Sequence, residues 1–369
     1  MVVAINCRHL TQQKLEGFGT YTIELVIRWI KEYKTVNFIL IFDREPTVDL
    51  PELHNVKKVV IGPPTRHPLL YWIWFEWVIP RVLKQYKATV FFSPDGYNSL
   101  RNKIPSVITV HDLNFEHNPA DLPKVLSWYL RKFIPLFVEK ATRVLTVSEY
   151  SKLDIVQCYA CPSEKITTVY NSANEIYHPL TDEIISATRS RISNNRPYFL
   201  FVGSLHPRKN VQRLITAYQR LNNPSVDLVI VGSAMWRDHH ITIDPSCVHR
   251  IHFLGYLTQK ELAEVMGSAL ALTYVPYFEG FGIPMVEAMR CGIPILAANT
   301  TCLPEIAGDA AIYCDPFRVQ EIQKGLEELI ENTVLREQLV ENSKKRGNKF
   351  SWELAAKQSW EVIFTTANT

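Results

Sequence analysis

Two glutamates, Glu279 and Glu287, flank a glycine-containing segment in the second half of this 369-residue chain. The segment follows the apolar run 270–275 and contains Pro284, which suits the first turn of a helix because its missing N–H has no helical partner there. We therefore expect a helix that begins near Ile283. Backbone amides at a helix start attract anions, so this loop is a candidate phosphate site. Its predicted ligand contacts are Gly280, Phe281, Gly282 and Ile283.

The positions of the two glutamates indicate what else would bind there. Glu279 stands just before the amides, and Glu287 lies about one turn inside the helix, roughly 6 Å farther along at 1.5 Å per residue. Carboxylates repel phosphate but accept hydrogen bonds from hydroxyl groups, so we expect a sugar on each side of the anion. Either residue alone could be an ordinary surface or helix-facing glutamate, whereas the combination with the glycines and Pro284 favours a binding site.

Two adjacent cations, Arg208 and Lys209, follow the apolar run 198–202 and Gly203. Arginine can hold phosphate oxygens through two parallel hydrogen bonds, and lysine supplies a mobile point charge. Cations near a helix start face the positive end of its dipole, so an anion should compensate them. A nucleotide diphosphate would do so; the alternative is a pair of solvated surface charges.

Weaker signals come from the first half of the chain. His111 follows the apolar run 107–110, at the carboxyl end of a predicted strand, where doubly wound sheets bind ligands. A structural hydrogen-bonding role is the alternative. Gly17 and Gly19 open a predicted helix and form either a tight turn or a ligand contact.

Short apolar runs alternate with helix-length segments along the whole chain. Such runs are typical of parallel strands covered on both faces by helices, so the alternation predicts an α/β protein with doubly wound sheets. Two sets of strands predict two Rossmann-like domains, residues 1–175 and 176–350, with a hinge between Asn171 and Pro197. Residues 351–369 are expected to form a helix that packs back on the first domain. The expected strands are residues 2–7, 36–42, 56–61, 88–93, 106–110, 144–147, 166–170, 198–202, 226–231, 251–254, 270–275, 293–297 and 311–313.

The sequence EGFGIPMVEAMRCGIPI, which starts at Glu279, resembles the E-x7-E element of retaining glycosyltransferases of family 4, which have the GT-B fold. The likeness extends over nearly the whole chain and is closest to the mannosyltransferase-like branch. It implies two Rossmann-like domains that face a central cleft, the first binding an acceptor and the second a nucleotide sugar. The further matching motifs are FVGSLHPRKNV from Phe201, VSE from Val147, HDL from His111 and GFG from Gly17.

The resemblance implies a role for the cations. Arg208 and Lys209 would neutralise the diphosphate as it leaves. Many family members carry arginine directly after the glycine that ends the strand, where this sequence has Ser204 after Gly203. We expect Arg208 to substitute for that arginine.

Roles for the other predicted residues also come from the resemblance. Glu279 would hold hydroxyls of the donor sugar, Glu287 those of the ribose, and His111 would contact the donor sugar. The glycine loop at the amino terminus would approach the donor diphosphate and the acceptor, and the segment 254–257 would contact the nucleotide base through its backbone. The residues expected to make these two sets of contacts are Gly17, Gly19, Tyr256 and Leu257.

The predicted function is retaining transfer of a hexose from a nucleotide-diphosphate sugar, with GDP-mannose as the expected donor. The acceptor would be a hydroxyl of a glycan or lipid-linked glycan in bacterial surface polysaccharide synthesis. We expect no cofactor and no metal, because the cations and helix amides supply the positive charge. A non-catalytic scaffold that binds nucleotide sugars is the alternative. A dehydrogenase fits less well, because no expected strand is followed by GxGxxG and an acidic residue about 20 positions on.

Composition limits the other classes of partner. The formal net charge is +3 and the sequence pI about 8.4, too mild to indicate nucleic-acid binding. Residues 1–175 hold 21 Lys and Arg against 17 Asp and Glu, so the basic excess lies in the first half. There, residues 67–87 combine aromatic side chains with cations. They form either an aromatic core helix or a surface for peripheral membrane contact, and are too short to span a bilayer.

The seven cysteines are odd in number and thinly spread. We therefore expect reduced thiols and a cytoplasmic protein. If residues 67–87 form a membrane-contact surface, the protein would associate with the inner face of the membrane. Cys158 and Cys161 form a CxxC pair, but no second pair stands at zinc spacing. We interpret them as ordinary thiols and predict no metal ligands.

Overall fold

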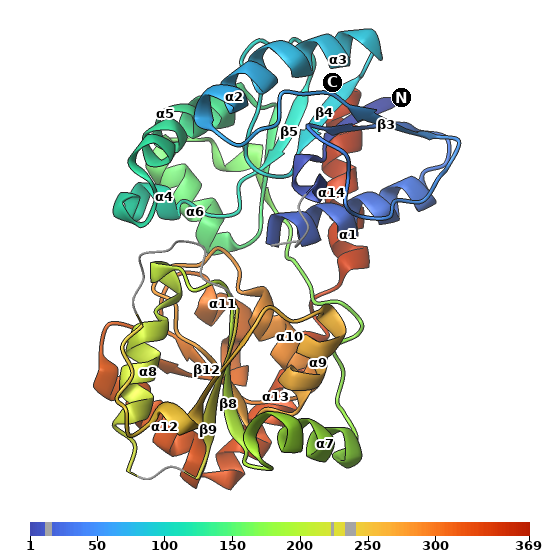
Figure 1. Ribbon diagram of the computed structural model, residues 1–369. Helices are drawn as coiled ribbons and strands as arrows, with labels where there is room; N and C mark the ends of the chain where they lie inside the picture. Colours follow the sequence, from blue (N-terminus) through green and yellow to red (C-terminus); the bar gives the residue numbers. More distant parts are fainter. Residues whose placement is uncertain (12–16, 223–224, 233–240) are drawn as a thin grey trace. The chain divides into compact units, whose positions relative to one another are not determined.

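Two parallel β-sheets organise the structure, one in each of two units of the chain (Figure 1). Unit 1 is Met1–Asn171 together with Trp352–Thr369, and unit 2 is Ser172–Ser351. The prediction of two Rossmann-like α/β folds is confirmed, and all thirteen expected strands are present. The computed structural model describes residues 1–11, 17–222, 225–232 and 241–369.

The sheet of unit 1 has the strand order β3-β2-β1-β4-β5-β6-β7, and every neighbouring pair is parallel. Val3 of β1 pairs with Phe38 on one side and with Val90 on the other. The order reverses between β1 and β4, and ligands bind at the carboxyl ends of strands at such a point. The strands are β1 Val2–Asn6, β2 Asn37–Phe42, β3 Val56–Val60, β4 Val90–Ser93, β5 Ser106–Thr109, β6 Arg143–Thr146 and β7 Ile166–Thr168.

Helices cover both faces of this sheet because its inner strands, such as β1, β2 and β4, are apolar on both sides. Val3 packs into the core that contains Trp29, beneath α1 and α14, whereas the next residue, Ala4, packs into the core that contains Trp74, beneath α2, α3 and α5. The helices are α1 Gly17–Glu32, α2 Pro68–Ile73, the π-helical turn Trp74–Val78, α3 Ile79–Gln85, α4 Asn114–His117, α5 Lys124–Lys140, α6 Glu149–Tyr159 and α14 Trp352–Ala367.

The last helix, α14, lies beside α1 in unit 1 (Figure 1). The indole Nε1 of Trp29 donates to the carbonyl of Ala356 at 2.7 Å, and Trp360 stacks on Tyr33 with ring centroids 4.1 Å apart. Trp360 is 5% exposed, and burying an aromatic side chain of this kind stabilises a fold by about 2–3 kcal/mol. The end of the chain is thus part of the core of unit 1.

The sheet of unit 2 has the order β10-β9-β8-β11-β12-β13, again with every pair parallel. Its order reverses between β8 and β11. These two strands are therefore the ones whose carboxyl ends are expected to hold a ligand. The strands are β8 Tyr198–Val202, β9 Asp227–Val231, β10 Ile251–Gly255, β11 Ala271–Tyr274, β12 Ile295–Ala298 and β13 Ala311–Cys314.

Two helix layers enclose the sheet of unit 2. On one face α8 packs against α12, and on the other α10 packs against α9 and α13 (Figure 1). Phe199 and Phe201 of β8 point into the core beneath α8 and α12. The helices are α7 Asp182–Ser193, α8 Val211–Gln219, α9 Gln259–Gly267, α10 Ile283–Cys291, α11 Leu303–Ala307, α12 Val319–Glu331 and α13 Thr333–Gly347. The 3-10 turns of the two units are η1 Arg8–Thr11, η3 Pro119–Asp121, η4 Ser163–Lys165, η5 Pro207–Lys209, η6 Val248–Arg250 and η7 Gly308–Ala310.

The aromatic segment 67–87 has two different faces. Trp74 and Phe75 are buried, and Nε1 of Trp74 donates to the carbonyl of Ile61 at 2.9 Å. Trp72 and Trp77 lie on the other side and are 36 and 41% exposed. The core interpretation therefore holds for one face of the segment only.

The carboxylate within this aromatic segment is also buried. Glu76 accepts hydrogen bonds from the backbone N–H groups of Leu100 and Arg101 at 2.8 and 3.1 Å, which compensate for its removal from water. Among the helices of the described residues, none combines the length and the apolar character that crossing a bilayer requires.

Candidate functional site

The carboxyl ends of β8 and β11 bring together the loops 203–210 and 275–282. The two strands are parallel neighbours, so both loops leave the sheet at the same edge. One loop carries the predicted cations and the other carries the first predicted glutamate.

Arg208, Lys209 and Glu279 form a buried ion-pair cluster at this edge. Nη1 of Arg208 donates to Oε1 of Glu279 at 2.6 Å and to the carbonyl of Phe278 at 3.0 Å. Nζ of Lys209 donates to the same Oε1 and, at 2.7 Å, to the hydroxyl of Tyr274. The side chains of Arg208, Lys209 and Glu279 are 23, 11 and 8% exposed, so water screens these charges only weakly.

The local structure of the loop after β8 fixes the two cations. Residues Pro207–Lys209 form the turn η5, and Nδ1 of His206 caps it by accepting the N–H of Arg208 at 3.3 Å. Asn210 follows with a φ of 61°, a left-handed conformation that asparagine tolerates better than most residues. Its Nδ2 donates to the carbonyl of Val275 at 2.9 Å, which ties this loop to the loop after β11.

The charges of the cluster decide the protonation of its members. Burial by itself raises the pKa of Glu279, but the charges of Arg208 and Lys209 outweigh burial and lower the pKa below its usual value. Burial and the charge of Glu279 raise the pKa of Tyr274, so its hydroxyl keeps its proton. One ionised carboxylate thus lies beside two cations.

The helix α10 begins at Ile283, as Pro284 predicts. Gly282 is its N-cap residue with a φ of 87°, a left-handed conformation that favours glycine. The first-turn amides of a helix have no acceptor within it and carry the positive end of its dipole. The segment Gly280–Ile283 therefore leads from Glu279 to an end of a helix that favours anions.

The predicted Gly203 lies where the backbones at the ends of β8 and β9 touch. A Cβ atom at Gly232 would stand 1.8 Å from the carbonyl oxygen of Gly203, which excludes any other residue at position 232. Gly203 itself has a φ of 149°, and its Cβ position faces the stem of Lys209. Because Gly203 has no side chain, the stem of Lys209 can pass beside it and reach Glu279.

Glu287 lies on α10 and has a different partner. Burial raises the pKa of Glu287 to about 7, and the hydrogen bond from the Tyr177 hydroxyl opposes that rise. The pKa values of the two glutamates of the motif are therefore shifted in opposite directions, because Glu279 has two cations beside it and Glu287 has a neutral phenol.

Tyr256 and Leu257 directly follow β10, the outermost strand on this side of the sheet. The N–H of Gly232 donates to the carbonyl of Gly255 at 2.8 Å, so the ends of β9 and β10 are held together. Tyr256 is 50% exposed at the same edge of the sheet as the ion-pair cluster. An exposed aromatic ring at a sheet edge can cover a planar base.

In unit 1, the predicted His111 follows β5. Its Nε2 donates to the carbonyl of Pro94 at 2.8 Å, and burial lowers its pKa to about 4. His111 is therefore neutral at physiological pH, and its Nδ1 can accept a hydrogen bond from a hydroxyl group. Its carbonyl accepts from the hydroxyl of Ser151 at 3.1 Å, which holds the backbone to the start of α6.

Gly17 and Gly19 lie in the first turn of α1. Gly17 is exposed and Gly19 is buried. Phe18, between them, meets the ring of His111 edge to face at a centroid distance of 4.7 Å. The structure thus places the predicted glycine loop against the predicted histidine.

A polar network at the carboxyl ends of β1 and β4 was not predicted. Arg8 donates from Nε to Asp95 Oδ2 at 2.6 Å, and Nε2 of His9 lies 2.9 Å from the same oxygen. Asn6 donates to Oδ1 of Asp95 at 3.0 Å. Burial raises the pKa of Asp95, but the neighbouring Arg8 and His9 outweigh it and lower the pKa. The available signal was the position of Arg8, His9 and Asp95 shortly after two expected strands.

An aromatic box surrounds the arginine of this network. The guanidinium carbon of Arg8 lies 4.3 Å from the ring centroid of Tyr97 and 4.9 Å from that of Tyr71. Arg8 is 6% exposed, so its charge is held by Asp95 and these ring faces. The partly exposed member is His9, which also contacts Phe18 at 5.4 Å between ring centroids.

The predicted residues therefore fall into three groups. Gly203, Arg208, Lys209 and Glu279 are joined by contacts at one edge of the sheet of unit 2, and α10 starts beside them. Glu287 and the pair Tyr256 and Leu257 belong to the same unit with other neighbours. Gly17, Gly19 and His111 gather in unit 1.

Two family descriptions match the chain, one for each half. Residues 15–175 match "Glycosyltransferase Family 4", and residues 183–346 match "Glycosyl transferases group 1". The chain is 28% identical over 366 residues to O-antigen chain mannosyltransferase B of Escherichia coli, covering 94% of this chain and 95% of that protein. It is 30% identical over 255 residues to O-antigen chain mannosyltransferase RfbU of Salmonella typhimurium, covering 68% of this chain and 67% of that protein.

Solved structures share the fold over the whole chain. Alr3699/HepE of Anabaena, solved in complex with UDP and glucose, has a TM-score of 0.80 and 18% identity and covers 99% of this chain and 100% of its own. WaaG, a glycosyltransferase involved in lipopolysaccharide biosynthesis, has a TM-score of 0.74 and 18% identity, covering 98% of this chain and 99% of its own. At these identities the likeness shows the fold, which is GT-B.

Proposed function

The chain belongs to glycosyltransferase family 4, and from this membership we propose that it transfers a hexose, with retention of anomeric configuration, from a nucleotide-diphosphate sugar. The acceptor in this proposal is a hydroxyl of a glycan or lipid-linked glycan in surface polysaccharide synthesis. The observation that carries the proposal is the cluster of Arg208, Lys209 and Glu279 beside the start of α10.

In this proposal the cluster stabilises the leaving group. Negative charge builds up on the diphosphate as the glycosidic bond breaks, and fixed cations and helix amides stabilise it without having to reorganise. Arg208 and Lys209 already point at one shared oxygen of Glu279, so a diphosphate would meet cations that are held in place. With this positive charge present, the reaction would need no divalent metal.

The carboxylates would bind sugars rather than phosphate. Glu279 is ionised and accepts hydrogen bonds, which suits a ligand with hydroxyl groups. The leaving phosphate oxygen would take the proton of the attacking hydroxyl, so that Glu279 orients the sugar and does not attack it. Glu287 would hold the ribose, Tyr256 and Leu257 the base, and in unit 1 Nδ1 of His111 would accept a donor-sugar hydroxyl.

Mannose is the proposed sugar and GDP-mannose the proposed donor. Support comes from the relatives named as O-antigen mannosyltransferases, of which one spans nearly the whole chain at 28% identity. The base contacts expected at residues 254–257 use backbone atoms, and these distinguish bases weakly. The donor therefore has to be identified by assay.

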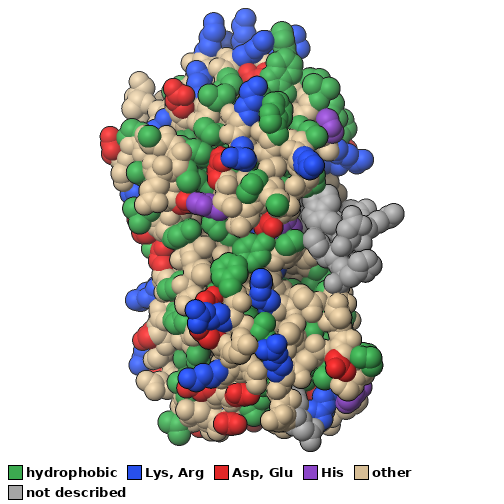
Figure 2. Space-filling model, turned by 90° about the vertical axis from the view of Figure 1, so that its left-hand side faces the viewer, with side chains coloured by type: hydrophobic (Ala, Val, Ile, Leu, Met, Phe, Trp, Pro, Cys, Tyr) green, Lys and Arg blue, Asp and Glu red, His purple; other side chains and the backbone are tan. Residues whose placement is uncertain are grey.

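We also propose that unit 1 contacts a membrane surface at the inner face of the cytoplasmic membrane. The helices α2 and α5 contact each other and carry exposed apolar side chains: Leu69, Trp72, Val125 and Trp128. Lys132 lies 5.0 Å from the ring centroid of Trp128, and Arg101 lies 3.9 Å from that of Trp77. Figure 2 shows Lys and Arg side chains interspersed with hydrophobic ones over this unit. Such a mixture suits a headgroup region with anionic lipids.

The test is release of nucleoside diphosphate from a panel of GDP, UDP and ADP sugars, with and without a lipid-linked glycan acceptor. Release that depends on the acceptor, with a product whose anomeric configuration matches the donor, is expected for one donor. Lys209→Met should lower kcat/KM by at least about 100-fold, because a fixed charge next to the leaving group is lost. Lys324→Met, at an exposed lysine of α12, is the matched control.

Two outcomes would contradict the proposal. Nucleotide-sugar binding without turnover with any acceptor would favour the scaffold alternative. Inversion of configuration would exclude the retaining mechanism while leaving the family membership intact.

A further inference from the structure

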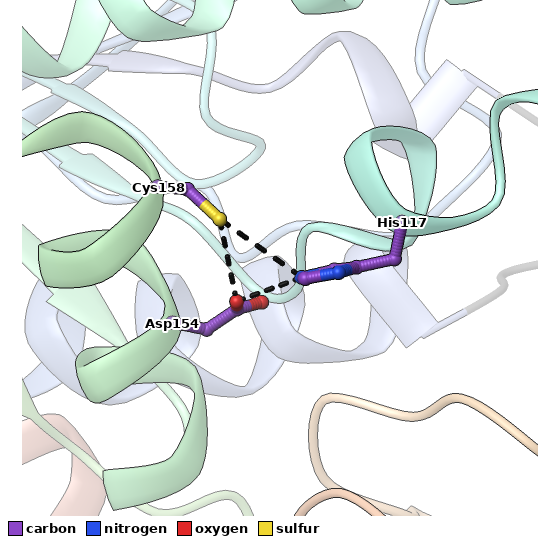
Figure 3. Close-up of side chains that lie close together, drawn as sticks. All are labelled: His117, Asp154 and Cys158. Atoms are coloured by element: carbon purple, nitrogen blue, oxygen red, sulfur yellow. Dashed lines mark hydrogen bonds and ion pairs between the residues drawn. The ribbon is translucent and has the colours of Figure 1, made fainter.

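Three side chains with metal-ligand chemistry converge on the surface of unit 1, outside the residues proposed for transfer (Figure 3). Nε2 of His117 lies 2.7 Å from Oδ1 of Asp154. Sγ of Cys158 lies 3.5 Å from the same oxygen and 4.0 Å from Nε2 of His117. Among the described residues this is the group of this kind whose ligand atoms all lie within 4.8 Å of one another.

Two helices present these side chains. Asp154 and Cys158 are four residues apart on α6 and therefore lie on one face of it, while His117 is the last residue of α4. Figure 3 shows the imidazole reaching from α4 toward the two side chains on successive turns of α6. Asp154 is buried, and His117 and Cys158 are exposed, so the group opens to solvent on one side.

A neighbouring carboxylate is held apart from the three. Glu116 accepts from the hydroxyl of Tyr159 at 3.0 Å and from Nε of Arg131 at 3.1 Å. It shares with Cys158 a shallow surface depression beside Pro135. Glu116 therefore adds negative potential near the group without entering it.

We propose that His117, Asp154 and Cys158 bind Zn²⁺, with water as the fourth ligand. One imidazole, one carboxylate and one thiolate are the three ligand types that zinc takes in proteins, and an open fourth position fits their exposure. Zinc bond lengths in a tetrahedron separate such ligand atoms by about 3.4–3.6 Å. The Cys158–Asp154 distance already agrees. The His117–Asp154 pair must widen by about 0.7 Å and the His117–Cys158 pair close by about 0.4 Å, within the reach of side-chain rotation.

Charge balance also suits zinc. On binding, the Cys158 thiol releases its proton to solvent, and the thiolate and the Asp154 carboxylate together neutralise the two charges of the ion. A hard cation such as Mg²⁺ would not be expected, because it prefers oxygen ligands and avoids sulfur and imidazole. The zinc site does not depend on the proposed transfer reaction.

Bound zinc would fix the loop that carries His111. The segment 111–117 is attached to α6 at its beginning, where the Ser151 hydroxyl donates to the carbonyl of His111. Zinc would attach its end to the same helix through His117. The ion would thus stabilise the segment at both ends and hold the His111 ring in place against Phe18.

The first experiment measures zinc binding to the full-length chain, stripped with a chelator and free of any histidine tag. Competition with a chromophoric chelator should give one Zn²⁺ per chain, and Co²⁺ should produce the near-ultraviolet charge-transfer band of a thiolate ligand. Cys158→Ser and His117→Gln should each weaken zinc binding by at least about 100-fold, since even outer partners of zinc ligands contribute 10–100-fold. Cys247→Ser, a partly exposed thiol of unit 2, is the control and should change nothing.

A second measurement keeps the test independent of folding in the variants. In the wild-type chain, zinc should slow alkylation of Cys158, but not of Cys247, as followed by peptide mass spectrometry. It should also slow amide hydrogen exchange in segment 111–117. Equal zinc affinity in the wild type and Cys158→Ser, or unprotected Cys158 at saturating zinc, would overturn the proposal.

Discussion

At the scale of single residues, Glu279 combines two tasks that a neutral side chain could not perform together. It is buried between Arg208 and Lys209, which keeps it ionised and holds both cations at one point. Removing one partner of a buried ion group leaves the others uncompensated. The consequences of changing Glu279 should therefore differ between nucleotide binding and sugar transfer.

Glu279→Gln should lower kcat/KM for transfer by at least about 100-fold, because the amide accepts sugar hydroxyls more weakly and no longer anchors the cations. Affinity for the nucleoside diphosphate alone should stay equal or rise, since an anion near the phosphates has been removed. Steady-state kinetics and calorimetric titration of the nucleotide measure the two effects. Glu337→Gln, at an exposed glutamate of α13, should leave both unchanged. Undiminished transfer in Glu279→Gln would argue against the assigned role.

Glu287 predicts a pH dependence with a definite sign. Its pKa is raised to about 7 in the folded chain, against an ordinary value of 4.5. Between these values the unfolded chain has lost the proton and the folded chain keeps it, so the free energy of unfolding falls as pH rises, by at most about 3 kcal/mol. Glu287→Gln should remove this loss. Urea unfolding of both proteins at pH 5 and pH 8 measures it, and an equal pH response in both would contradict the raised pKa.

Sequence patterns identified part of the candidate site for physical reasons that can be named. Glycine, proline and acidic residues at fixed spacing specify a helix start, so α10 could be placed from residues 279–287 alone. The pairing of Arg8 with Asp95 could not be predicted in this way, because 87 positions separate the two residues and only the strand order brings them together. The sequence analysis predicted no metal ligands and interpreted Cys158 as an ordinary thiol. His117 lies 41 positions from Cys158, and only the fold brings the two side chains together.

At the scale of elements, the two faces of the segment 67–87 show what a hydrophobic pattern can and cannot specify. Aromatic residues at helical spacing predict burial, yet Trp72 and Trp77 face outward while Trp74 faces the core. The exposed indoles lie near cations of neighbouring elements, as the 3.9 Å between Arg101 and the Trp77 ring shows. This arrangement leads to a prediction for the membrane surface proposed above.

The double variant Trp72→Ser, Trp128→Ser should bind vesicles of phosphatidylglycerol and phosphatidylethanolamine at least about tenfold more weakly, because two indoles no longer leave water. Its thermal stability should fall less than on loss of a buried indole, since both side chains are partly exposed. Phe364→Ser, at an exposed aromatic residue of α14, is the matched control. Vesicle sedimentation measures the effect; equal binding by the double variant and the control would exclude this face as the membrane contact.

The strands were predictable as elements because both faces of each sheet are covered. A strand buried on both sides needs apolar residues without a break, as in Tyr198–Val202. Parallel strands also need a crossover connection, and most of the connections here contain a helix. The packing of α14 depends on different information. Its contacts join Trp360 to Tyr33 and Ala356 to Trp29. In the sequence all of unit 2 lies between these partners, so no local pattern contains such pairings.

At the scale of the whole molecule, each unit has its own sheet and its own cores, and the chain passes between units twice, after Asn171 and after Ser351. The ion-pair cluster lies wholly in unit 2, whereas α14 contributes to unit 1 only. Changes in the two units should therefore be separable in unfolding experiments.

Whether the two units unfold separately can be tested with one ligand and one variant. A nucleoside diphosphate at 100 times its Kd should raise the free energy of unfolding of unit 2 by about 2.7 kcal/mol, because it binds the folded cluster and not the unfolded chain. Trp360→Ala should lower the free energy of unfolding of unit 1 by about 3–5 kcal/mol, because a buried side chain is lost. Phe364→Ala, at an exposed residue of the same helix, is the control and should lower it less. Hydrogen exchange resolved by peptide distinguishes the units. If the nucleotide slowed hydrogen exchange in unit 1 only, the diphosphate would bind away from Arg208 and Lys209. These cations could then not stabilise the leaving group, and the proposed transfer mechanism would be wrong.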